Sequence, residues 1–143
     1  YFTRLKILKA NVNHESLHQI SRLNGLVSGV KVTEEYRGLN EAFTELINKK
    51  SLGKDYPEVS YCGYQPAVKE LERLLEYGKI NDKEIFSIYF NNNVNQLDDL
   101  FKKRFNLDDN EYQKLIKAFY NAKDGKKVPV NELKKLITSI ILR

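Results

Sequence analysis

Both histidines of the 143-residue chain, His14 and His18, lie in a single H-E-S-L-H segment. Side chains four residues apart leave an α-helix on the same face, one turn from each other. Two imidazole rings at this spacing can bind one metal ion, provided that the segment is helical. Asn13 is a suitable N-cap for such a helix, and Asn24-Gly25 is a suitable stop. We therefore expect a helix over residues 13–24.

Glu15 lies between the two histidines in sequence, but on a helix its side chain leaves from a different face. On a helix it lies about 100° round the axis from His14, so it cannot join the same set of ligands. It can instead reach a water molecule held in the open position of the metal. This position predicts Glu15 as a general base. Because a catalytic zinc takes three protein ligands and a water, one protein ligand remains to be found.

A second motif follows, Asn40-Glu41-Ala42-Phe43-Thr44-Glu45, and 22 residues separate His18 from Glu41. Together the two motifs resemble those of the gluzincins, zinc metallopeptidases whose third ligand is a glutamate on a second helix. The thermolysin-like form of the second motif is N-E-x-x-S-D, in which the last acid supports a zinc-bound histidine. The resemblance, over residues 12–47, implies that Glu41 binds zinc and that Glu45 is the supporting acid. Glu replaces Asp at that supporting position, and the spacer is a few residues longer than in thermolysin.

The resemblance implies a hydrolase, a protease with a mainly α, zincin-like core in which the HExxH helix is crossed by the glutamate-bearing helix. We expect that second helix over residues 33–48. Residues 1–58 would form the zinc-binding half, and residues 59–143 a C-terminal helical subdomain of the same catalytic domain. The chain begins at Tyr1 and contains no methionine, so we expect an upstream segment.

A peptidase of this kind needs a hydrogen-bond donor for the oxyanion that forms at the scissile carbonyl. The irregular stretch 48–65 contains three tyrosines, Tyr56, Tyr61 and Tyr64. Each is a candidate donor, and their spacing does not distinguish between them.

The rest of the chain is predicted to be helical, because its apolar residues recur at helical spacing. Pro66 suits a first helical position, and Asn81 and Asp108 each precede a glutamate three residues later, which is a capping pattern. Another helix is expected around residues 97–105, and Asn131 is expected to begin the last one.

Charge suggests one alternative to an enzyme. Residues 100–143 carry 11 Lys and Arg against 5 Asp and Glu, so the basic excess of the chain lies there. A basic helical face of this kind can bind nucleic acid, although a solvated lysine-rich surface explains it more simply.

Residues 109–142 also have the outline of an EF-hand, with a loop at 121–132. Lysines stand at the third and sixth loop positions, where calcium requires an oxygen ligand and the turn requires glycine. The second alternative is thus a degenerate, non-catalytic EF-hand-like module that binds peptides. The single cysteine, Cys62, excludes an internal disulfide, and no apolar run approaches the length of a membrane span.

Overall fold

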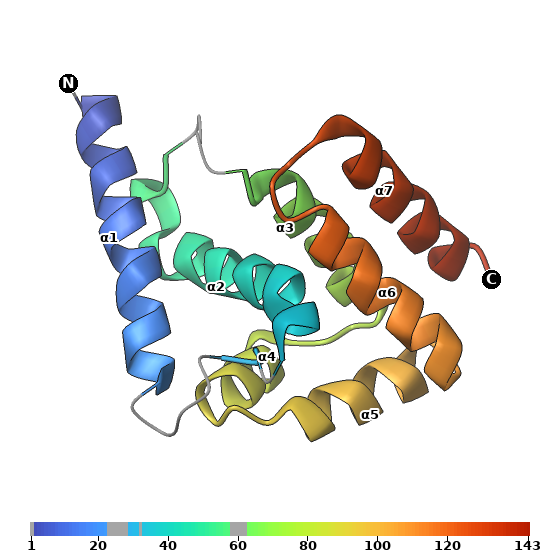
Figure 1. Ribbon diagram of the computed structural model, residues 1–143. Helices are drawn as coiled ribbons and strands as arrows, with labels where there is room; N and C mark the ends of the chain where they lie inside the picture. Colours follow the sequence, from blue (N-terminus) through green and yellow to red (C-terminus); the bar gives the residue numbers. More distant parts are fainter. Residues whose placement is uncertain (1, 23–28, 32, 58–62) are drawn as a thin grey trace.

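The computed structural model describes residues 2–22, 29–31, 33–57 and 63–143 (Figure 1). Within them the chain forms α-helices, joined by turns and two short 3-10 segments, and no strand, so the mainly α expectation is confirmed. The helices are α1 (Phe2–Arg22), α2 (Arg37–Leu52), α3 (Gln65–Tyr77), α4 (Asp82–Phe90), α5 (Val94–Arg104), α6 (Asp109–Asn121) and α7 (Lys127–Ile141). No helix in these ranges is long and apolar enough to cross a membrane.

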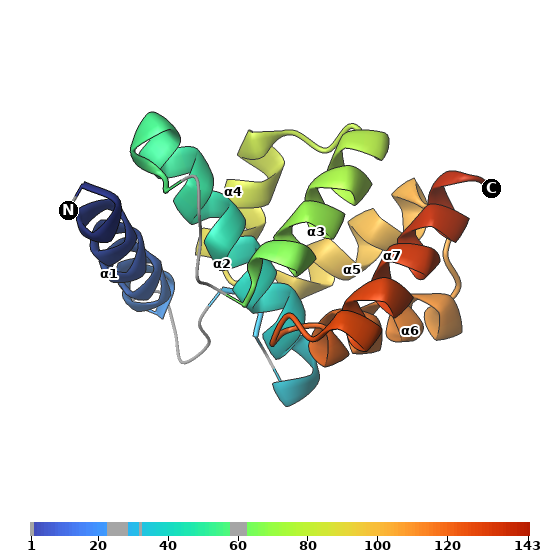
Figure 2. The same ribbon diagram turned by 90° about the horizontal axis from the view of Figure 1, so that it is seen from above.

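The centre of the fold is α2, which packs against α1 on one side and against α3 and α6 on the other (Figures 1 and 2). Of its residues, nearly every one from 38 to 48 is buried. A single apolar core runs from Leu17 of α1 to Ile140 of α7. The two parts expected at residues 1–58 and 59–143 therefore share one core.

The first helix is longer than expected. It begins at Phe2 and not after Asn13, since residues 2–12 contain no proline or glycine to stop it. Asn13 lies in mid-helix, where its amide donates hydrogen bonds to Asn48 Oδ1 (2.7 Å) and Ser51 Oγ (3.0 Å) of α2. The predicted N-cap was wrong because this side chain bonds across to the neighbouring helix.

The second helix begins later than residue 33. Its first turn is replaced by a 3-10 segment, Glu34–Tyr36, that leads directly into Arg37. Gly38 lies at the crossing of α2 with α6, where an added Cβ would be 2.3 Å from the carbonyl oxygen of Phe119. The absence of a side chain at this position therefore allows α2 to approach α6 closely.

Most of the expected boundaries in the C-terminal part are confirmed. Asn81 accepts a hydrogen bond from the Glu84 backbone, and Asp108 forms a full capping box with Glu111. The last helix differs, since α7 begins at Lys127 and not after Asn131. Only residues 122–126 separate it from α6, so the twelve-residue loop of an EF-hand is not formed.

Candidate metal centre

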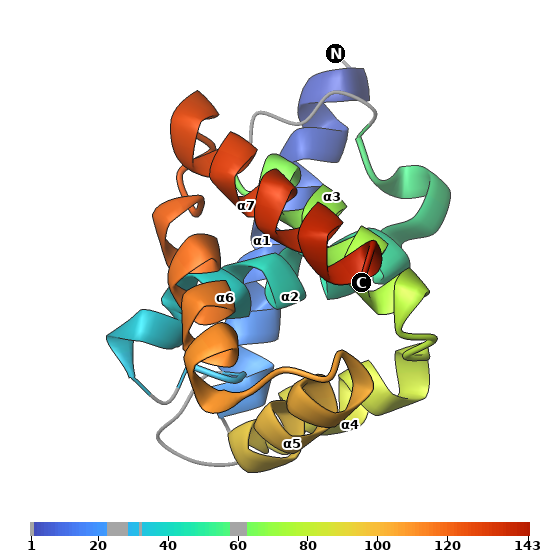
Figure 3. The same ribbon diagram turned by 90° about the vertical axis from the view of Figure 1, so that its right-hand side faces the viewer.

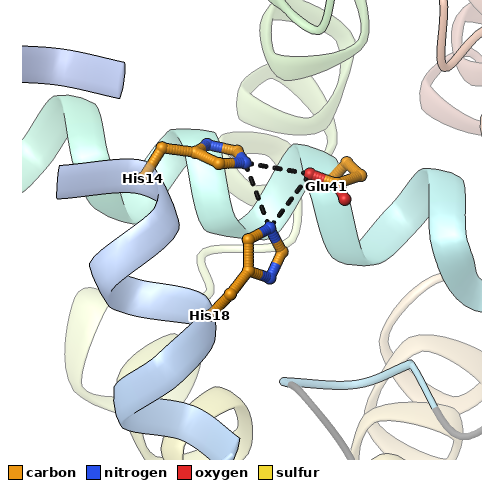
Figure 4. Close-up of side chains that lie close together, drawn as sticks. All are labelled: His14, His18 and Glu41. Atoms are coloured by element: carbon orange, nitrogen blue, oxygen red, sulfur yellow. Dashed lines mark hydrogen bonds and ion pairs between the residues drawn. The ribbon is translucent and has the colours of Figure 1, made fainter. Parts of the chain in front are cut away.

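His14 and His18 point from one face of α1 toward α2, and Glu41 points back toward them from α2 (Figure 4). The Nε2 atoms of the two histidines are 3.1 Å apart. Oε2 of Glu41 lies 3.0 Å from Nε2 of His14 and 3.2 Å from Nε2 of His18. Three potential ligand atoms thus form a nearly equilateral triangle, as the two sequence motifs predicted.

This triangle has the size that a small divalent cation requires. Zinc bonds of about 2.0–2.2 Å to nitrogen and oxygen place tetrahedral ligands roughly 3.3–3.5 Å apart. The three distances are slightly shorter than that. The side chains of His14, His18 and Glu41 are 7%, 12% and 14% exposed, so the group is recessed but still open to solvent. The geometry fits an ion with three protein ligands and an open position.

Glu45 lies behind the triangle and holds His14 in place. Its Oε2 is 2.6 Å from Nδ1 of His14, while its Oε1 accepts hydrogen bonds from Tyr56 Oη (2.5 Å) and Asn48 Nδ2 (3.3 Å). With the Nδ1 proton directed to Glu45, a neutral His14 presents the lone pair of Nε2 to the centre of the triangle. Glu45 therefore occupies the supporting position that the motif implied.

Asn48 was not identified from the sequence, although it links the two helices that carry the site. Its amide donates to the carbonyl oxygen of Ala10 (2.8 Å) as well as to Glu45, and it accepts a hydrogen bond from Asn13. These contacts fix the distance between α1 and α2. The available signal was its spacing, since Asn48 follows Glu45 by three residues and so shares its helix face.

Asn40 and Thr44, the uncharged polar residues of the second motif, form hydrogen bonds with neighbouring segments of the chain. Oδ1 of Asn40 accepts a hydrogen bond from the Val30 backbone (2.9 Å), which fastens the segment that follows α1 to α2. Thr44 Oγ1 lies 2.7 Å from the hydroxyl of Tyr89 and donates to the Asn40 carbonyl (2.8 Å). Asn40 and Thr44 thus connect α2, which carries Glu41, to Val30 and to α4.

The charges of the site favour a cation at its centre. Burial alone would lower the pKa of His14, but Glu41 and Glu45 outweigh burial and raise this pKa to about 9. Burial would raise the pKa of the Glu41 carboxyl, yet His14 and His18 lower it to about 2. Burial would likewise raise the pKa of the Glu45 carboxyl, but hydrogen bonds with His14 and Tyr56 outweigh burial, and this pKa is lowered. Two ionised carboxylates therefore stabilise positive charge here, which either a proton or a metal ion supplies.

We expect the metal-free protein to lose stability as this proton leaves. The pKa of His14 rises from 6.5 to about 9 on folding, so the stabilisation is fully present below pH 6.5 and is lost as the pH approaches 9. The loss is on the order of 3 kcal/mol. Urea unfolding of chelator-treated protein across this pH range measures it. The variant His14→Gln lacks the titrating group and should show no such decline; equal declines in both proteins would contradict the assignment.

Glu15, the predicted base, is exposed on α1. It lines a shallow depression together with Gln19 and Ile20 on the outer side of the helix. Its carboxylate is not part of the triangle and forms no hydrogen bond or ion pair with any other residue that the structure describes. No member of the triangle lines this depression, so the approach of Glu15 to a metal-bound water stays a prediction.

The three candidate oxyanion donors have different positions. Tyr56 donates its hydroxyl proton to Glu45 and accepts a hydrogen bond from Gln65, so it supports the site and is a poor candidate for the oxyanion. Tyr61, like Cys62, lies outside the described residues. Tyr64 stacks on the ring of His14 with centroids 5.4 Å apart. Of the two described tyrosines, Tyr64 is the better candidate.

Comparison of the chain with protein-family models, with curated proteins and with solved structures found no match in any of the three.

Proposed function

We infer that the chain is a zinc-dependent metallopeptidase whose metal is bound by His14, His18 and Glu41. The observation that carries this proposal is the triangle of ligand atoms, with sides of 3.0, 3.1 and 3.2 Å, formed by residues from two packed helices. The resemblance of the two motifs to those of gluzincins supplies the reaction class. The contact of Glu45 with His14 supports the same reading, because zinc-binding histidines commonly donate to a carboxylate.

Each residue of the site has a proposed role in peptide-bond hydrolysis. Zinc at such a site lowers the pKa of a bound water toward about 7 and polarises the scissile carbonyl. Glu15 would be the general base, which would take a proton from the attacking water and return it to the leaving amine. Glu45 keeps His14 in the orientation and tautomer that a ligand requires. Tyr64, beside His14, is the candidate donor to the oxyanion.

Iron is the competing metal. Two histidines and one carboxylate also bind iron(II) in oxygenases. The H-E-x-x-H spacing favours zinc, because it adds an exposed acid next to the first ligand, where a hydrolytic site needs a base. Elemental analysis distinguishes the two metals directly.

The test is the metal content of the protein purified without a histidine tag. We expect close to one equivalent of zinc per chain by inductively coupled plasma mass spectrometry. A protein that holds iron in place of zinc would overturn the peptidase proposal but keep the metal site. A protein that binds no metal even after zinc is added would support a non-catalytic binding module instead.

Single histidine variants test the ligands themselves. His14→Ala and His18→Ala should each lose most of the bound zinc, since two remaining ligands bind it weakly, and their thermal midpoints should fall toward that of the chelator-treated protein. Gln19→Ala, on the exposed face of the same helix, is the matched control and should retain zinc. Unchanged zinc content in either histidine variant would refute the site.

A further inference from the structure

The outer surface of the α6–α7 hairpin contains a groove of about 760 Å³. The α6–α7 hairpin lies on the opposite side of the molecule from α1, as Figures 1 and 2 both show, and α6 and α7 pack side by side (Figure 3). Lys114, Lys117 and Asn121 line it from α6, and Val128, Glu132 and Leu136 line it from α7. These spacings of three and four residues mark one continuous face of each helix. The groove therefore runs along both helices for about two turns.

The rim of the groove is strongly basic. Both acids in its lining are already paired with lysines, Asp124 with Lys123 (3.6 Å) and Glu132 with Lys135 (3.9 Å). The lining lysines Lys114, Lys117 and Lys126 form no ion pair within the described part of the chain. Three positive charges thus surround the groove without a compensating carboxylate.

The floor of the groove is apolar and partly open. Val128 is 70% exposed, among the highest values for a large apolar side chain in the described residues. Pro129, Ala118 and Leu136 are half-buried beside it. Ala118 and Leu136 also pack against the apolar core, to which these helices contribute the buried side chains of Phe119 and Ile137, whereas Val128 is not part of that core.

We propose that the α6–α7 groove binds an acidic amphipathic helix of a partner protein. The apolar face of that helix would lie on Val128, Pro129 and Leu136, and carboxylates along its edges would meet Lys114 and Lys117 on one side. Helix-in-groove recognition uses this combination of an apolar seat and anchors at helical spacing. Complementary charge at the rim adds specificity and a faster association rate.

Nucleic acid fits this surface less well. The described lining contains no aromatic side chain on which bases could stack. An apolar floor also contributes nothing to binding of a phosphate backbone, because that binding depends on cationic side chains. The inference is independent of the proposed peptidase activity, because the groove shares no residue with the metal centre.

The experiment uses a fluorescein-labelled helical peptide of about 16 residues, with leucines on one face and glutamates along both edges. We expect saturable binding to the full chain by fluorescence anisotropy at physiological salt. Lys117→Glu and Val128→Asp should each weaken binding by roughly 10-fold, about 1.4 kcal/mol. Lys134→Glu is the matched control, because this exposed lysine of α7 does not line the groove.

Three further probes decide between occupants: the same peptide with serine for leucine, the peptide with lysine for glutamate, and a 16-nucleotide single-stranded DNA. The proposal requires all three to bind at least about 10-fold more weakly than the acidic amphipathic peptide. Equal binding of the DNA or of the serine peptide would show a purely electrostatic surface and overturn it. Absence of binding, or binding that Lys117→Glu and Val128→Asp leave unchanged, would also overturn it. Circular dichroism and zinc content of each variant confirm that the fold and the metal centre are intact.

Discussion

Glu41→Ala is expected to yield protein that is essentially free of metal at ordinary zinc concentrations. At the proposed site the carboxylate of Glu41 would supply one of three ligand atoms, and the only charged one, since histidine binds zinc as a neutral ring. The substitution also removes Oε2, which lies 3.0 Å from Nε2 of His14 and 3.2 Å from Nε2 of His18. Zinc content after dialysis, and the affinity measured by competition with a chelator, record the loss.

Two other acids give matched comparisons for Glu41. Glu45→Gln keeps the shape of the side chain but weakens its bond to Nδ1 of His14, so it should bind zinc about 10- to 100-fold more weakly and still be loaded at high zinc. Glu35→Ala, in the exposed turn before α2, should behave as the unaltered chain does. If Glu45→Gln lost the metal and Glu41→Ala retained it, the roles of the two acids would be reversed.

Glu15→Gln is expected to abolish peptide cleavage while leaving the zinc in place. The amide cannot take a proton from water, and a positioned general base typically contributes about 10²- to 10⁴-fold to the rate. Since Glu15 is exposed and forms no hydrogen bond or ion pair with another described residue, the substitution should change neither the fold nor the ligand triangle. Cleavage of a quenched fluorescent peptide library, measured beside zinc content, separates the two effects.

The control for that variant is Gln19→Ala, one turn further along the exposed face of α1, which should keep most of the activity. Loss of zinc from Glu15→Gln would show that Glu15 is a ligand and not a base. A zinc-loaded wild-type protein that cleaves no member of the library would refute the peptidase proposal and leave the metal site standing.

The sequence alone determined the local features of this protein. His14 and His18 are four residues apart, so a single turn of helix brings their rings together. Glu41 and Glu45 have the same spacing and therefore lie on one face of the next helix. Capping at Asn81 and Asp108 was equally predictable, because it depends on residues three positions apart. All of these properties follow from interactions within a few residues of the chain.

The tertiary structure decided the properties that depend on contacts between distant segments. Asn13 resembles an N-cap in sequence, yet it lies in mid-helix because Asn48 and Ser51 provide its hydrogen-bond partners. The sequence did not distinguish Tyr56 from the two other candidate oxyanion donors, whereas in the structure its hydroxyl donates a hydrogen bond to Glu45. Packing of α1 against α2 fixed which carboxylate oxygen faces both histidines. The α6–α7 hairpin created a groove from residues that the sequence had assigned to a basic helical face and to the outline of an EF-hand. No local pattern encodes such contacts, because the energy that selects them comes from burial and hydrogen bonding across the whole core.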